Sequence, residues 1–172
     1  MLKKDLLKSE YDEYYEQYIR LIPEDTKLLS GYLVDKENTL EFFNAIAEEN
    51  FDYRYQPDKW SIKDVLQHMI DNERIFTFRI LRVSRNDSFN LPDFDPDQYI
   101  EASEANKKTK YQLLEEFIIT RDFSINIIKS INESNLKNIG IVSNSKMSAN
   151  ACAFLTLGHS LWHMNTLKEK YL

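Results

Sequence analysis

The chain has 172 residues, of which 42% are hydrophobic and 13% aromatic, so it holds enough apolar material for a sizeable core in one domain, residues 1–172. Only 3 glycines and 4 prolines interrupt it, which argues against a turn-rich sandwich, barrel or Rossmann sheet and favours an all-α fold. The formal net charge of −6 has the wrong sign for a surface that binds nucleic-acid phosphates.

Cysteine content and hydropathy bear on the compartment of the protein. The single cysteine, Cys152, cannot form an internal disulfide, as is typical of proteins in a reducing compartment. The sequence shows neither a cleavable signal peptide nor an apolar run of about 18 residues. We therefore expect a soluble cytoplasmic protein with neither a membrane nor a nucleic-acid partner.

The first part of the chain is rich in tyrosine. Apolar and aromatic residues recur every three or four positions over residues 4–22, which predicts an amphipathic lead-in helix stopped by Pro23. Its tyrosine face is expected to be half buried and could line a homodimer interface. A second helix is expected from residue 25 or 26 to about 50, with an irregularity around residues 35–38.

Residues 61–85 form the best-marked helix of the sequence. Ser61 is a good N-cap, and Asp64, three residues later, can close a capping box with it. Trp60 and Val65 occupy the two positions of a hydrophobic staple. The start of this helix is therefore strongly specified.

The second half of the chain continues the helical pattern. A loop rich in Asp and Pro is expected at residues 91–97, and a third bundle helix at about 109–132. Residues 138–146 are expected to form a loop or at most a strand stub. A fourth helix, started by Ser148, should run from residue 149 to the end. These elements predict an antiparallel four-helix bundle with an extra N-terminal helix.

The most informative residues are the three histidines, His68, His159 and His163. His159 and His163 are spaced i, i+4 on a predicted helix, so both imidazoles lie on one face and can bind one metal ion. His68 lies two turns into the capped helix and could join them from a neighbouring helix. Three imidazoles with one open position make a catalytic type of metal site.

The alternative is that these histidines are buried and hydrogen-bonded, or exposed on amphipathic helices. An H-x-x-x-H motif is short enough to occur by chance. A zincin site is excluded, because Ser160 and Leu161 stand where H-E-x-x-H needs its general base.

Other polar residues near His68 are candidates for supporting roles. Asp71 or Asn72 could orient an imidazole, supply a further ligand or hold a water on the metal. The alternative is a polar helix face on which Glu73 pairs with an arginine. Arg79, three turns after His68 and on the same face, could bind a substrate carboxylate or simply brace the bundle.

Two further features are expected to be structural. Cys152 lies too far from His159 for the same metal and should be a small core residue. Asp93, Asp95 and Asp97 imitate the start of an EF-hand loop. The glycine that such a loop needs for its sharp turn is absent, so we expect a solvated acidic loop.

Two motifs resemble those of the DinB/YfiT-like superfamily. The run from residue 53 to 76, with Lys59-Trp60-Ser61, His68 and Glu73-Arg74, is similar to the family's first histidine motif. Residues 158–163 resemble its closing G-H-x-x-H-H motif, except that Trp162 replaces the first histidine of the final pair. Residues 91–95 and Glu116-Phe117 with Arg121 match its middle section.

This resemblance implies a four-helix bundle that binds a divalent metal through His68, His159 and His163. Nickel or zinc is the expected metal, followed by iron, manganese or cobalt. Relatives include enzymes that transfer a low-molecular-weight thiol such as bacillithiol to electrophiles, and this S-transferase activity, in detoxification or stress response, is our first expectation for a small-molecule substrate. A metal-dependent hydrolase and a non-catalytic metal or ligand-binding protein remain the alternatives.

Overall fold

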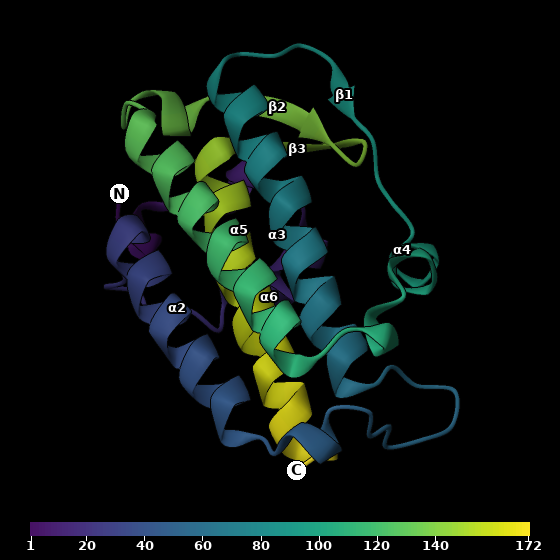
Figure 1. Cartoon of the computed structure of the whole chain (residues 1–172). Helices are drawn as coiled ribbons and strands as arrows, with labels where there is room; N and C mark the ends of the chain where they lie inside the picture. Colours follow the sequence, from purple (N-terminus) through teal and green to yellow (C-terminus); the bar gives the residue numbers. More distant parts are fainter.

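Four long helices form a bundle in the computed structural model, which describes residues 1–172 (Figure 1). The predicted four-helix bundle is confirmed. The bundle helices are α2 (Leu28–Ala45), α3 (Ile62–Ser84), α5 (Lys110–Ser130) and α6 (Ala149–Lys170). The remaining elements are η1 (Lys3–Asp5), η2 (Lys8–Glu10), η3 (Glu13–Tyr15), α1 (Glu16–Ile19), η4 (Glu48–Asn50), β1 (Asn90–Leu91), α4 (Pro96–Ser103), η5 (Ala105–Lys107), η6 (Asn135–Lys137), β2 (Ile139–Val142) and β3 (Ser145–Ser148).

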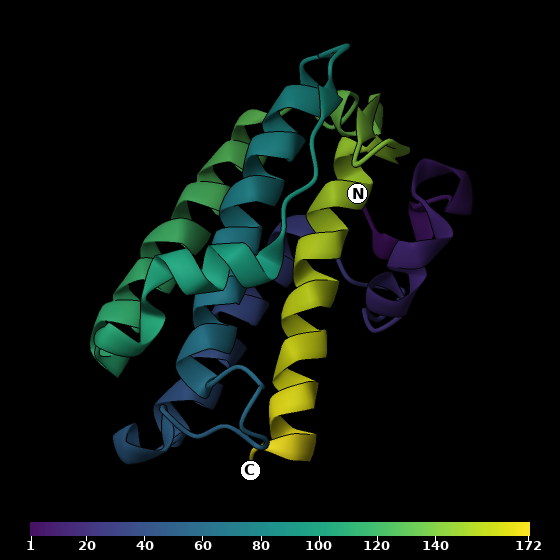
Figure 2. The same ribbon diagram turned by 90° about the vertical axis from the view of Figure 1, so that its right-hand side faces the viewer.

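The bundle helices are not antiparallel at every contact. α3 and α6 run in opposite directions, as do α2 and α5, whereas α3 runs parallel to α5 and α2 runs parallel to α6 (Figure 1). The connection from α3 to α5 makes this possible, because it returns along the outside of the bundle and carries α4 across α3 (Figure 2). In this arrangement α3 and α6, which carry the histidines, lie side by side.

Side-chain caps fix where three of the bundle helices begin. The Ser61 hydroxyl accepts a hydrogen bond from the Asp64 N–H at 3.1 Å, and the Asp64 carboxylate accepts one from the Ser61 N–H at 2.9 Å. Thr109 and Gln112 form the same capping box at the start of α5. Ser148 caps α6 by accepting from the Ala151 N–H. The predicted starts at Ser61 and Ser148 are confirmed.

The lead-in helix predicted for residues 4–22 is wrong. Short 3-10 turns and the single turn of α1 take its place. The carboxylates of Asp5, Glu10 and Asp12 accept hydrogen bonds from backbone N–H groups two or three residues before or after them. Such local bonds compete with a continuous helix. The predicted irregularity in the second helix is also absent, since α2 is continuous and shorter than expected.

Residues 138–146 form more structure than the expected loop or strand stub. β2 and β3 pair as an antiparallel hairpin, and β1 adds to β2 in parallel. The two loop residues, Ser143 and Asn144, have φ values of 49° and 63°, as a type I′ hairpin turn requires. The acidic loop is partly helical, because Asp95 caps α4 and Pro96 occupies its first turn.

A polar layer divides the core of the bundle into two apolar clusters. One cluster of 20 buried residues lies towards the hairpin, and another of 13 lies towards the C-terminus. Between them along the helices lie buried polar side chains from all four bundle helices. At the centre of this polar layer, Arg121 forms ion pairs with Glu73 and Asp35.

None of the helices combines the length and the apolar character that a membrane span requires.

Candidate metal centre

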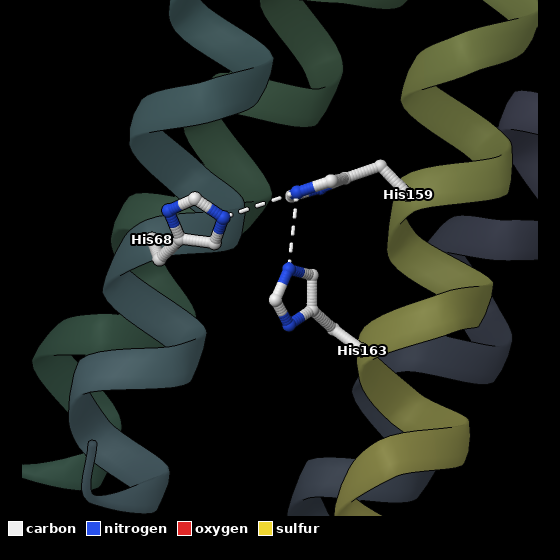
Figure 3. Close-up of side chains that lie close together, drawn as sticks. All are labelled: His68, His159 and His163. Atoms are coloured by element: carbon white, nitrogen blue, oxygen red, sulfur yellow. Dashed lines mark hydrogen bonds between the residues drawn. The ribbon is translucent and has the colours of Figure 1, made fainter. Parts of the chain in front are cut away.

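The three histidines meet between α3 and α6, next to the polar layer. His68 comes from α3, and His159 and His163 come from successive turns of α6 (Figure 3). The His159 Nε2 atom lies 3.0 Å from the Nε2 of His68 and 3.0 Å from the Nε2 of His163. All three side chains are buried, and their potential ligand atoms lie within 4.8 Å of one another. The structure thus brings together the i, i+4 histidines and His68, the three residues singled out in the sequence.

This arrangement fits a divalent metal ion. Nitrogen ligands at 2.0 to 2.1 Å from one ion lie about 2.8 to 3.4 Å apart in octahedral or tetrahedral geometry, and the separations of 3.0 Å fall within that range. Lone pairs aimed at one another repel unless a proton or a cation lies between them. Among the His, Cys, Asp and Glu side chains of the chain, these three histidines form the group that could hold a metal ion. The protein would therefore supply three ligands and leave further coordination positions open.

The electrostatics of the triad keep its imidazoles neutral. Burial lowers the pKa of His68 to about 4. Burial, together with repulsion between the neighbouring histidines, lowers the pKa values of His159 and His163 well below the usual range. A neutral imidazole is the form that binds a metal, so all three are ready to act as ligands at neutral pH.

Aromatic rings surround the histidines. The Trp60 ring centroid lies 4.7 Å from that of His68, and the Trp162 centroid lies 4.8 Å from that of His163. The Tyr18 ring lies 5.7 Å from His159 and comes from the lead-in segment. These rings limit the directions from which water reaches the centre.

Gly158 lets the lead-in segment approach α6 this closely. A Cβ atom at this position would lie 2.4 Å from the Tyr18 carbonyl oxygen, closer than any real contact. The glycine that precedes His159 therefore has a packing reason, and it seats Tyr18 beside the triad.

The histidines stand at one end of a cleft of about 540 Å³. This is within the range of small-molecule sites, which usually measure roughly 300 to 1,000 Å³. Much of the lining is aromatic, and the remainder includes a few polar groups. The aromatic lining residues are Tyr14, Tyr15, Tyr18, Trp60, Phe76, Phe94 and Trp162.

The predicted supporting residues lie in three different places. Asn72 is buried and lines the cleft beside His68 and His159. Asp71 does not reach the triad, because its carboxylate pairs with Arg74 at 3.0 Å and accepts from the Gln67 amide, on the side of α3 that faces α4 and α5. One residue along a helix rotates the side chain by about 100°, which separates Asp71 from Asn72.

The other predicted residues are also placed by the structure. Arg79 lines the far end of the cleft. Glu73 pairs with an arginine, as the alternative expectation held, but the pair is buried and the partner is Arg121. Cys152 is a buried core residue, as expected, and burial raises its thiol pKa to about 12.

The acidic loop does not gather its carboxylates around a cation. Asp93 lies 3.7 Å from the Arg79 guanidinium, Asp95 caps α4, and Asp97 accepts a hydrogen bond from the Trp60 indole N–H at 3.0 Å. The expected solvated loop is thus tied to the cleft, and the resemblance to an EF-hand has no structural counterpart.

Sequence reasoning missed the aromatic walls of the cleft. Tyr15 and Tyr18 were expected on a half-buried face, and they lie inside the chain's own cleft. The signal available for Trp162 was its place between His159 and His163. No comparable signal existed for the tyrosines, because their helical register was predicted for a helix that does not form.

Comparisons with known proteins agree with this architecture. Residues 34–167 match the sequence model of the DinB superfamily. The structure is similar to that of YfiT from Bacillus subtilis, with a TM-score of 0.69 and 13% sequence identity over 95% of this chain and 89% of the other. YfiT is described as a probable metal-dependent hydrolase with an unusual four-helix bundle topology. No curated protein matches the chain in sequence.

Proposed function

The chain belongs to the DinB superfamily, and from this membership and its three-histidine centre we propose that it is a divalent-metal-dependent enzyme that transfers a low-molecular-weight thiol, such as bacillithiol, to electrophiles. The observation that carries the proposal is the convergence of three neutral imidazoles at the end of an open cleft, without a fourth protein ligand. A closed structural site would have four. Nickel and zinc are the proposed metals, because both suit imidazole ligands.

The residues of the chain have separable roles in this proposal. His68, His159 and His163 hold the cation, which when bound lowers the pKa of a thiol or a water beside it and so supplies a nucleophile at neutral pH. Trp60 and Trp162 pack on two of the ligands and restrict their rotation. The Asn72 amide, buried in the cleft wall, is placed to hold a substrate by hydrogen bonds.

The direct test is turnover by the metal-loaded protein with a panel of thiols. A chlorinated nitrobenzene or a bimane serves as the electrophile. We expect thiol-dependent loss of the electrophile, which disappears in the His159→Gln protein. The Cys152→Ser protein is the matched control, because the buried Cys152 thiol is not the proposed nucleophile and its loss should leave the rate unchanged.

Metal-dependent hydrolysis is the second candidate, favoured by the fold shared with YfiT. The same centre could activate water, so turnover of ester, amide or phosphate model substrates without any thiol would favour hydrolysis over transfer. A thiol titration of the cobalt-substituted protein separates both from simple binding. We expect the visible spectrum to change with added thiol, and a spectrum that does not change would favour a non-catalytic binding protein.

A further inference from the structure

Arg79 lies at the opposite end of the cleft from the histidines. It follows His68 by eleven residues on α3, which corresponds to about 16 Å along the helix axis and to the same face of the helix. Its side chain is 2% exposed but lines the cleft. The cleft therefore has a metal-binding end and an end that holds Arg79, its only lysine or arginine, while the carboxylates of Asp12 and Asp93 also line it.

The guanidinium of Arg79 uses only part of its hydrogen-bonding capacity. Nη2 donates to the Pro92 carbonyl at 2.7 Å and to the Ser143 hydroxyl at 3.2 Å. Nε and Nη1 donate to no group of the chain, although an arginine carries five N–H donors. Neither nitrogen is among the fully buried polar atoms without a partner, which belong to Glu10 and Asn150, so both keep some access to the cleft that Arg79 lines.

Arg79 also lacks a buried counter-ion. Its closest carboxylate is that of Asp93, at 3.7 Å, and the Asp93 side chain is 71% exposed. By contrast, Arg121 in the same bundle is paired with two buried carboxylates. A buried cation is normally paired, so the site at Arg79 is incomplete without an anion from outside the chain.

The Arg79 guanidinium packs against two aromatic rings. The Arg79 Cζ atom lies 4.9 Å from the Phe76 ring centroid and 6.0 Å from that of Phe94. These cation–π contacts hold the guanidinium in place. The free Nε–H and Nη1–H groups of an arginine held in this way can each donate a charge-assisted hydrogen bond, which a carboxylate accepts more strongly than a neutral group does.

We propose that the cleft binds an elongated molecule with an apolar or aromatic body and a terminal carboxylate, and that this carboxylate binds Arg79 while the reacting group lies at the histidines. Tyr15, Tyr18 and Leu155 also line the cleft, and their side chains suit contact with an apolar ligand body. Asp93 competes with the ligand carboxylate for Arg79 from the solvent side. The position of the reacting group rests on the proposed function, whereas the carboxylate site does not.

Calorimetric titration of the metal-free protein tests the carboxylate site. The probes are 4-phenylbutyrate and the neutral 4-phenylbutan-1-ol, which have the same body. We expect the acid to bind about tenfold more tightly than the alcohol, as a hydrogen-bonded charge pair would give. Arg79→Met should remove this preference, and Arg79→Lys should keep part of it.

Two further variants make the test specific. Asp93→Asn removes the competing carboxylate and should tighten acid binding several-fold, with no change for the alcohol. Arg74→Met is the matched control, since Arg74 lies on the same helix but faces Glu116 and Asp71, and its loss should leave the preference unchanged.

Equal affinities for acid and alcohol, failure of the acid to bind at millimolar concentration, or a preference that survives in Arg79→Met would overturn the proposal. If Arg79→Met does not fold, the Asp93→Asn and Arg79→Lys proteins decide the matter. The outcome is independent of catalysis. Thiol-dependent turnover without an acid preference would reject only the carboxylate site, and an acid preference without turnover would reject only the proposed function.

Discussion

Two polar clusters lie side by side in the core of this bundle, and they are completed in different ways. In the polar layer, Arg121 donates to Glu73 at 2.8, 2.9 and 3.1 Å and to Asp35 at 2.6 Å. In the histidine centre, three imidazole nitrogens face one another and no carboxylate joins them. The first cluster is complete within the chain, whereas the second needs a proton or a cation between its nitrogens and has the geometry to hold a metal ion.

The ionisation of the two clusters follows from this difference. Burial alone would lower the pKa of Arg121, but Glu73 and Asp35 hold it above its usual value. No carboxylate belongs to the histidine group, and burial lowers the pKa of His68 to about 4. A buried polar group whose partners are all present contributes to a unique structure, whereas one whose partner is missing marks a binding site. The comparison therefore separates the structural half of the polar core from its functional half.

Glu73→Ala should have the largest effect on stability and would break the structural half. It leaves Arg121 buried with only Asp35, and the loss of one partner from a buried ion pair costs about 3 to 5 kcal/mol. Chemical denaturation of the metal-free protein measures this change in the free energy of unfolding. The matched control is Glu116→Ala, which removes a partly exposed partner of Arg74 and Lys108 and should cost about 1 kcal/mol or less. Similar losses for both variants would refute the distinction.

Trp60→Ala should affect both stability and the functional half. The Trp60 ring packs on His68 and its indole N–H donates to Asp97, and Trp60→Ala removes both contacts while the main-chain carbonyl still accepts from the Tyr171 hydroxyl. Because the ring is only half buried, we expect a loss of about 2 kcal/mol, less than for a fully buried Trp.

Metal affinity should fall in parallel with stability in Trp60→Ala, because His68 loses the ring that holds it. Trp60→Phe keeps an aromatic contact but loses the hydrogen bond to Asp97, so it should retain most of the affinity. A destabilised Trp60→Ala protein with unchanged metal affinity would show that the ring serves only the fold.

Measuring the free energy of unfolding as a function of pH should sharpen the comparison. The expected change for each histidine is smaller than the loss expected for Glu73→Ala. The folded-state pKa of His68, about 4, lies below the value of about 6.5 for an unfolded chain. The unfolded state therefore binds the proton first, and the stability of the metal-free protein should be full above about pH 6.5 and fall as the pH drops towards 4.

His68 alone should contribute a loss of about 2 kcal/mol between pH 7 and pH 5. Denaturation of the metal-free protein at the two pH values measures it. His68→Gln should remove this share of the pH dependence, because the amide does not titrate. An unchanged pH dependence in His68→Gln would place the titrating group elsewhere.

Local signals in the sequence predicted most of the bundle and the pairing of two of the three histidines that lie together in the structure. Caps and hydrophobic periodicity are encoded within a few residues, so the start of α3 at Ser61 and the pairing of His159 with His163 follow from spacing alone. The resemblance to a family predicted that His68 joins this pair, because spacing alone does not determine which helices pack together.

Features that depend on tertiary packing could not be predicted. The lead-in segment follows a helical pattern but folds into short turns, and its Tyr18 packs against Gly158 and His159, which are far away in the sequence. Asp71 and Asn72 are both near His68 in sequence, and only the arrangement of α4, α5 and α6 around α3 decides that Asn72 faces the cleft.

The metal content of the purified protein tests the central claim most directly. Elemental analysis should find about one divalent metal ion per chain in the wild-type protein. It should find far less than one in His159→Ala, whose two remaining imidazoles make a poor site. Glu73→Gln, which alters only the structural half, should keep its metal. Full occupancy in His159→Ala, or a wild-type protein that binds no divalent metal under any loading condition, would contradict the account.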